Sequence, residues 1–175
     1  MRPPVPTPRT HLFLSRSRGC LERPQLGLEG VDPDPRKLAM AAACGVAFNA
    51  LHQGDALSLP DGPFDCVTIL DVLYHMSDAD KQRVLRECLR VLNPGGRLVV
   101  KELDTQPAWK VIPSRLQEMI SVRLVNLTHG DRLHFQPVEA LAEAAAAVGF
   151  ESVEVLRVDQ GYLHPHVVVR ALRPS

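Results

Sequence analysis

Two short apolar runs flank a charged segment with helical periodicity in the middle of the chain. Cys66–Leu70 and Leu98–Val100 are rich in aliphatic and β-branched residues, which is typical of strands buried on both faces. Between them, apolar residues recur at helical spacing and charged residues lie mostly on the other side: Val84, Leu85, Cys88, Leu89 and Leu92 against Asp78, Asp80, Lys81, Arg83, Arg86, Glu87 and Arg90. The pattern predicts strand, helix and strand, joined as a right-handed crossover between parallel strands.

A similar unit precedes this one. Leu28–Asp32 predicts a short strand that ends in a carboxylate. Pro33 and Pro35 suit the first turn of a helix, where a missing N–H costs nothing, and Gly45 ends that helix. Ala50–Gln53 predicts a further short strand. Strands and helices therefore alternate along the first half of the domain.

The last third of the chain has a different pattern. The segment Gln106–Gln136 has no strand character, and its centre, Pro113–Thr128, predicts a helix buried on more than one side. Pro137 opens another helix. Ser152–Val158 and Tyr162–Leu172 predict two strands whose short connection requires an antiparallel hairpin.

The N-terminal residues differ from the rest in composition. Residues 1–26 combine prolines, arginines and serines without a period, so we expect an irregular leader there, with Leu12–Ser15 as a candidate strand. Residues 27–175 are expected to form one α/β domain, a sheet with helices on both faces. In such sheets ligands bind beyond the carboxyl ends of the strands, near the point where strand order reverses.

The charge balance excludes some classes of partner. Twenty Lys and Arg residues match twenty Asp and Glu residues, so no net charge recruits nucleic acid or an anionic membrane. No apolar run approaches the roughly 20 residues that span a bilayer, and Leu12–Leu14 is too short for the core of a signal peptide. We therefore expect no nucleic-acid partner, no membrane partner and no secretion.

The cysteines indicate neither a metal nor a redox site. Cys20, Cys44, Cys66 and Cys88 lie more than twenty residues apart and never form a Cys-x-x-Cys pair. Unoxidised cysteine behaves as a small apolar residue, so we expect buried free thiols and no bound metal. A reducing cytoplasm is the compartment that fits free thiols.

Four short segments follow one another along the domain: Gly30–Asp34, Gly54–Pro60, Phe64–Val67 and Leu92–Leu98. Their order and intervals resemble the motifs of class I S-adenosylmethionine-dependent methyltransferases of the small-molecule type. The resemblance covers about residues 28–103, and the C-terminal hairpin fits the antiparallel last strands of that fold. It implies a Rossmann-like, doubly wound α/β fold with a mostly parallel sheet, and S-adenosylmethionine as cofactor.

The resemblance implies contacts to the adenosine half of the cofactor. Asp32, followed by Pro33, matches the acidic residue that binds the ribose diol, and the two oxygens of a carboxylate suit two adjacent hydroxyls. Asp55 matches the residue that accepts from the adenine amino group, and the backbone N–H of Ala56 can address a ring nitrogen. Two alternatives stay open, because Asp32 could cap the next helix and Asp55 could be a turn residue.

The resemblance also implies contacts near the reacting methyl group. Asp71 and Val72 follow the fourth strand, where the family lines the methionine part of the cofactor. Asp71 could equally be a structural hydrogen-bonding residue. His75 is the candidate catalytic base, with His129 and His134 as further candidates, although each could be an ordinary surface or packing histidine.

Polar residues after the fifth expected strand are further candidates. Lys101, Glu102 and Asp104 could face a polar substrate, or they could be the solvated end of that strand. Trp109 and the segment Gln106–Gln136 fall where a lid over the site would form.

The glycine-rich element of the family has no counterpart in this sequence. In the family, the first strand ends in a glycine-rich loop, Asp-x-Gly-x-Gly-x-Gly, expected roughly 20 to 25 residues before Asp32. Leu12–Cys20 occupies that region with one glycine and no acidic residue. Two explanations remain: a truncated gene or shifted start, and a domain that has lost its cofactor loop. We expect the first strand to be missing or degenerate.

The sequence therefore predicts transfer of a methyl group from S-adenosylmethionine to a small-molecule acceptor. Such a transfer is an in-line displacement in which the protein mainly aligns two reactants. A protein of methyltransferase fold that binds little cofactor, or an inactive truncated fragment, is the alternative. The state of the glycine-rich loop separates the two hypotheses.

Overall fold

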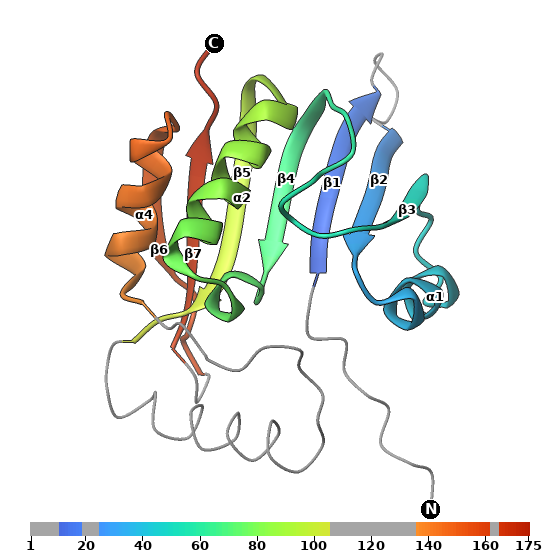
Figure 1. Cartoon of the computed structure of the whole chain (residues 1–175), viewed down its shortest axis with the longest axis horizontal. Helices are drawn as coiled ribbons and strands as arrows, with labels where there is room; N and C mark the ends of the chain where they lie inside the picture. Colours follow the sequence, from blue (N-terminus) through green and yellow to red (C-terminus); the bar gives the residue numbers. More distant parts are fainter. Residues whose placement is uncertain (1–10, 19–24, 106–135, 162–164) are drawn as a thin grey trace, which may run out of the picture.

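The structure of this chain is a computed structural model, which describes residues 11–18, 25–105, 136–161 and 165–175. Side chains are described from residue 27 onward. Within these residues, strands join in a single sheet and helices pack against it (Figure 1).

Several predictions fall outside the described residues. They are the helix at Pro113–Thr128, the histidines His129 and His134, and Trp109 with most of the expected lid. They stay predictions.

The elements follow the predicted alternation of strands and helices. In chain order they are β1 (His11–Arg18), β2 (Gln25–Asp32), α1 (Pro35–Ala43), β3 (Ala50–Gln53), β4 (Phe64–Leu70), the 3₁₀ turn η1 (Leu73–His75), α2 (Asp78–Val91), β5 (Leu92–Leu103), α4 (Val138–Ala147), β6 (Glu151–Arg157) and β7 (His166–Leu172).

The strand order is β3-β2-β1-β4-β5-β7-β6. β2 pairs parallel with β3, and β4 pairs parallel with β5. The two crossovers run outward from β1 in opposite directions, and because such crossovers are right-handed as a rule, α1 and α2 belong to opposite faces of the sheet. The doubly wound α/β fold and the antiparallel C-terminal hairpin of β6 and β7 are confirmed.

The position of the first strand is filled, and the strand that fills it runs against its neighbours. β1 pairs antiparallel with both β2 and β4, so the sheet is mixed (Figure 1). Residues 11–18 are thus part of the sheet, which bears out the candidate strand at Leu12–Ser15, whereas the expected leader was otherwise irregular and its strand missing or degenerate. β1 satisfies the backbone edges of β2 and β4, which would otherwise stay unpaired in the middle of the sheet.

The direction of β1 follows from the length of its connection to β2. Only residues 19–24 separate Arg18 from Gln25, and a parallel pair needs a crossover of about a dozen residues or more. A neighbouring strand reached through this connection can therefore only be antiparallel.

The main core lies between the sheet and the pair α2 and α4. Alternate residues of the central strands are fully buried, as the pleat requires: Val67 and Ile69 of β4, Leu98 and Val100 of β5, and Val167 and Val169 of β7. They meet the predicted apolar face of α2, with Val84, Leu85 and Cys88, and the apolar stripe of α4, with Leu141 and Ala145.

One residue of α2 departs from the predicted polar face. Lys81 is 2% exposed, although its sequence position suggested the solvent side. Its Nζ donates to Asp78 Oδ1 at 3.0 Å, one turn back and in the first turn of the helix. The aliphatic stem of a lysine can line apolar surface while the ammonium keeps a charged partner, so helical periodicity alone does not exclude such burial.

Candidate functional site

The predicted site residues follow strands that end at one edge of the sheet. β2 and β3 run in the same direction, as do β4 and β5, and β1 is antiparallel to both β2 and β4. All four parallel strands therefore end at this edge, which we call the carboxyl edge. Strand order reverses at β1, so a ligand crevice is expected here.

Asp32, the last residue of β2, is a buried carboxylate with one satisfied oxygen. Its Oδ1 accepts from the backbone N–H of Asp34 at 2.8 Å. Its Oδ2 is buried without a hydrogen-bond partner, and it forms a long ion pair with Lys37 Nζ at 3.8 Å. A buried carboxylate oxygen without a donor is costly, so Oδ2 is suited to receive a donor from a ligand.

The alternative function of Asp32, as helix cap, belongs to another residue. Asp34 is the N-cap of α1, and its side chain accepts from the backbone N–H of Arg36 at 2.9 Å. The ion pair with the Arg36 side chain holds the pKa of Asp34 below its ordinary value. Asp32 is therefore not required to cap α1.

Asp55 forms a turn beyond the end of β3. Its Oδ1 accepts from the backbone N–H of Leu57 at 2.9 Å, which is the geometry of an Asx turn. The turn fixes the backbone of Ala56, which is 7% exposed. One oxygen of Asp55 therefore acts in a turn, which was one of the two predicted alternatives. The contact of Asp55 with an adenine stays a prediction.

Asp71, just after β4, is held by a lysine from the neighbouring strand. Both carboxylate oxygens lie 2.7 Å from Lys101 Nζ. The backbone of Asp71 has φ of 55°, a conformation that aspartate adopts more readily than most residues, and its N–H donates to the carbonyl of Lys101 at 2.9 Å. The pair anchors the chain at the point where it leaves β4.

Glu102 is buried behind the same turn. Its Oε1 accepts from the backbone N–H groups of Val72 at 3.0 Å and Leu73 at 2.6 Å. Its Oε2 is buried without a hydrogen-bond partner. Burial raises the pKa of Glu102 to about 7, assisted by the charge of Asp71 and opposed by the two N–H donors and by Lys101.

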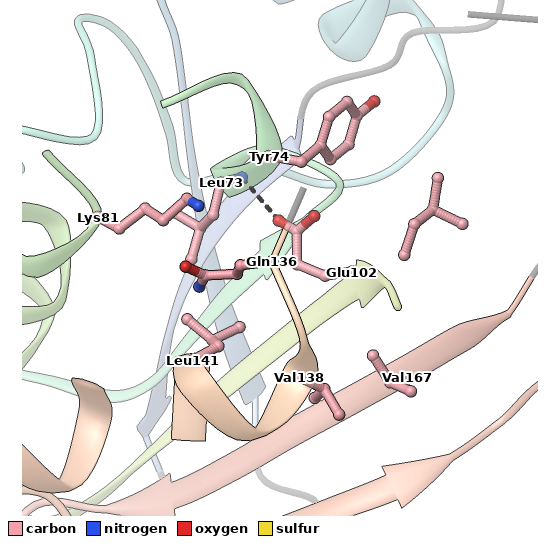
Figure 2. Close-up of a pocket in the computed structure, with 9 residues that line it drawn as sticks. Leu73, Tyr74, Lys81, Glu102, Gln136, Val138, Leu141 and Val167 are labelled. Carbon is pink, nitrogen blue, oxygen red and sulfur yellow. Dashed lines mark hydrogen bonds between the residues drawn. The ribbon is translucent and has the colours of Figure 1, made fainter. Parts of the chain in front are cut away.

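A small cavity adjoins the Glu102 carboxyl group. Its volume is about 20 Å³, which is room for about one water molecule. Glu102 and Lys81 line it together with Leu73 of η1 and Gln136 ahead of α4, and Figure 2 shows these side chains around the carboxyl group. The sequence suggested the solvated end of a strand as one interpretation of Glu102, and this interpretation is wrong, because the residue is 6% exposed.

Asp104 is likewise buried rather than solvated. It is 2% exposed, and its Oδ2 accepts from Arg157 of β6 at 2.8 Å. Its Oδ1 accepts from the backbone N–H groups of Thr105 at 2.7 Å and Val138 at 3.3 Å. Asp104 therefore joins the end of β5 to the start of α4 and to β6.

His75, the candidate base, lies at the end of η1. Its ring and that of Tyr74 are 4.0 Å apart between centroids. Tyr74 is 6% exposed, whereas His75 is partly exposed. The histidine therefore stands on the turn that follows β4 and is partly accessible to solvent.

The described residues contain neither a membrane-spanning helix nor a cluster of metal ligands. Among them, no helix is both long enough and apolar enough to cross a membrane. In the same part of the chain, no group of three or more His, Cys, Asp or Glu side chains could hold a metal ion.

The carboxyl edge fits one half of S-adenosylmethionine. Asp32 Oδ2 offers a buried acceptor for a ribose hydroxyl, and the Asx turn presents the backbone of Ala56 beside β3. In the family, a glycine-rich turn follows the first strand. Here β1 ends with Arg18 at the opposite edge of the sheet, so it does not lead to the carboxyl edge. The described residues thus fit the adenosine half.

The sequence missed two features of the site. Lys81 had no signal, since a lone lysine in an amphipathic helix reads as solvent-facing. Glu102 was named, but the sequence left open whether it is buried. It lies on the same face of β5 as Leu98 and Val100, because alternate residues of a strand face the same side, and this could have indicated burial.

The chain shares its fold with solved methyltransferase structures. Residues 18–100 match the family described as "Methyltransferase domain". This match agrees with the predicted class of protein, a methyltransferase that depends on S-adenosylmethionine.

The curated relatives specify the comparison further. The chain is 52% identical over 125 residues to a "Ubiquinone/menaquinone biosynthesis C-methyltransferase UbiE" of Escherichia coli O1:K1 / APEC, an alignment that covers 64% of this chain and 49% of the relative. The chain thus spans about half the length of the curated relatives that it matches.

Solved structures show the same fold at low identity. A Haloferax volcanii methyltransferase, in complex with the Trm112 methyltransferase activator, has a TM-score of 0.66 at 17% identity and covers 84% of this chain and 71% of its own. Human N-acetylserotonin methyltransferase, in complex with S-adenosylmethionine, has a TM-score of 0.59 at 16% identity and covers 84% and 40%. At these identities the likeness concerns the fold alone.

Proposed function

We propose that this chain transfers a methyl group from S-adenosylmethionine to a small-molecule acceptor in the cytoplasm. The observation that carries the proposal is the buried Asp32 carboxylate, whose Oδ2 lacks a hydrogen-bond donor at the carboxyl edge. A ribose hydroxyl would supply that donor. The methyltransferase family match supports the same chemistry.

The cofactor, when bound, supplies an electrophilic methyl group on a positively charged sulfur. The chain's own contribution is alignment. Asp32 and the following Pro33 orient the ribose, and Asp55 with the N–H of Ala56 orients the adenine. Asp71 and Val72 line the methyl end, where the Lys101 pair and the Glu102 bonds keep the turn in place.

His75 is the proposed base for acceptors that must lose a proton. Histidine is the side chain that most often acts as a general base, and it can accept a proton from an acceptor hydroxyl or a ring carbon. An acceptor that already carries a lone pair needs alignment only, and His75 then has no chemical role.

The acceptor class is a separate part of the proposal. The curated relatives are named as ubiquinone/menaquinone biosynthesis C-methyltransferases. Precursors of these quinones are therefore the first acceptors to assay, with methyl transfer to carbon as the expected reaction. The neutral net charge of the chain argues against nucleic acid as the acceptor.

The test is calorimetric titration of the chain and of Asp32→Asn with S-adenosylhomocysteine. The side-chain oxygen of asparagine can still accept from the Asp34 N–H. The charged acceptor Oδ2 is then replaced by part of an uncharged amide. A hydrogen bond to a charged group contributes about 1.5–3 kcal/mol, so affinity should fall by about 10- to 100-fold.

Asp34→Asn is the matched control, since it lies two residues away and asparagine is also a good N-cap. Its affinity for S-adenosylhomocysteine should stay within about twofold of the wild type. Equal binding by Asp32→Asn would remove the ribose assignment. A folded wild-type chain that binds neither S-adenosylmethionine nor S-adenosylhomocysteine would exclude the proposed function.

A further inference from the structure

β1 begins at the carboxyl edge and runs away from it. His11 pairs with Leu70 and Leu12 with Val31, so the start of β1 lies beside the ends of β4 and β2. Arg18 pairs with Gln25 at the other edge. β1 therefore ends at the edge of the sheet opposite to the site.

The backbone donors after β4 are already used within the chain. The N–H groups of Val72 and Leu73 both donate to Glu102 Oε1, and the N–H of Asp71 donates to the carbonyl of Lys101. These groups can therefore not hold a ligand carboxylate without breaking bonds to a buried glutamate.

Three cations among the described residues near the edge are also paired with carboxylates. Lys101 Nζ contacts both oxygens of Asp71 at 2.7 Å, and Arg157 contacts Asp104 at 2.8 Å. Lys37 Nζ lies 3.8 Å from Asp32 Oδ2. With Glu102 ionised, the described edge carries more carboxylates than cations, so a further carboxylate would be repelled, and the α-ammonium of the amino-acid group would only offset this repulsion.

We propose that the described residues of the carboxyl edge recognise the nucleoside part of the ligand and add no affinity for an α-amino-acid carboxylate. Neutral nucleosides with a 5′-thioether are then ligands as good as S-adenosylhomocysteine. The inference rests on the proposed function, because the shared adenosine group is what Asp32 would bind. The inference goes beyond the proposed function because it names the part of the ligand that the site recognises.

The experiment compares two probes by calorimetry on the full chain, S-adenosylhomocysteine and 5′-methylthioadenosine. They share the adenosine and the thioether sulfur and differ by the amino-acid group. A site with two or three charge-assisted hydrogen bonds to the carboxylate would lose about 1.5–3 kcal/mol for each, which is about 100-fold or more in affinity. For this chain we expect the two dissociation constants to agree within tenfold.

Each outcome decides a different statement. S-adenosylhomocysteine binding more than tenfold tighter than 5′-methylthioadenosine overturns the inference and leaves the proposed function standing. Binding of neither probe by the folded chain overturns both. Binding within tenfold supports the inference, provided that Asp32→Asn weakens both probes by the same factor and Asp34→Asn weakens neither. Unequal loss in Asp32→Asn would mean that the two probes occupy different sites, which also overturns the inference.

Discussion

At the scale of single residues, Glu102 couples the site to pH. Its pKa is about 7 in the folded chain, against an ordinary value of 4.5, chiefly because the carboxyl group is buried. The folded state therefore binds the Glu102 proton more tightly than the unfolded state does. The contribution of Glu102 to stability is complete below about pH 4.5, is lost as pH rises toward 7, and changes no further above that.

We expect Glu102→Gln to remove this part of the pH dependence. The shift corresponds to up to about 3 kcal/mol between pH 4.5 and pH 7 or above. Urea unfolding from pH 5 to pH 8 should show the wild type losing free energy of unfolding relative to Glu102→Gln across this range. Glu143→Gln, on the exposed side of α4, should run parallel to the wild type. A constant difference between wild type and Glu102→Gln at every pH would contradict the assignment.

At the scale of elements, Asp104 holds the C-terminal part of the fold to the sheet. One carboxylate meets the end of β5, the first N–H of α4 and Arg157 of β6. Replacing the Asp104 carboxylate by a neutral group leaves at least one of these buried donors without an acceptor. Breaking a buried pair in this way costs about 3–5 kcal/mol, and half-exposed Arg157 retains some solvent, so a lower cost is expected here.

Asp104→Asn should accordingly lower the free energy of unfolding by about 2–3 kcal/mol. Chemical denaturation at pH 8 measures it. Asp61→Asn is the control, because the Asp61 side chain is 96% exposed and its pair with Arg90 contributes less than about 1 kcal/mol. Equal stability of the two variants would show that Asp104 does not link these elements.

The elements themselves were largely predictable from sequence. Periodicity located α2 and β4, and the proline pair located α1, because local spacing decides which residues can face a core. The sequence could not assign the partners of Glu102 and Lys81, because burial of a charged side chain depends on what distant strands and helices bring to it. Asp32, Asp55 and Asp71 were found through the motifs, and their ligand contacts stay predictions.

At the scale of the whole molecule, the direction of β1 decides what the carboxyl edge can bind. Two features of the sequence are relevant to the direction of β1. They are the missing glycine-rich loop and the short spacing between Leu12–Ser15 and Leu28–Asp32. The strand prediction alone does not give direction, since an apolar run reads the same either way. The connection length does, because residues 19–24 are too few for a parallel crossover.

A crosslink to the native Cys66 tests the direction of β1. Ser15 stands opposite Cys66 in the antiparallel register, and opposite residues have Cα atoms about 4.5–5.5 Å apart, a spacing that a disulfide spans. Ser15→Cys should therefore form a disulfide with Cys66 under mild oxidation, in a background where Cys20 and Cys44 are serine. Cys88 can stay, because it is fully buried and burial raises the pKa of its thiol to about 12.

His11→Cys in the same background is the matched control. In the antiparallel register His11 stands opposite Leu70, four residues beyond Cys66 and about 13 Å along the strand, too far for a disulfide. A β1 that ran parallel to β4 over the same span would exchange the two positions. Peptide mapping without reductant should thus find most of the Ser15→Cys chains linked to Cys66 and few of the His11→Cys chains. The reverse result would turn β1 around, place its C-terminal end at the carboxyl edge, and remove the first argument of the further inference.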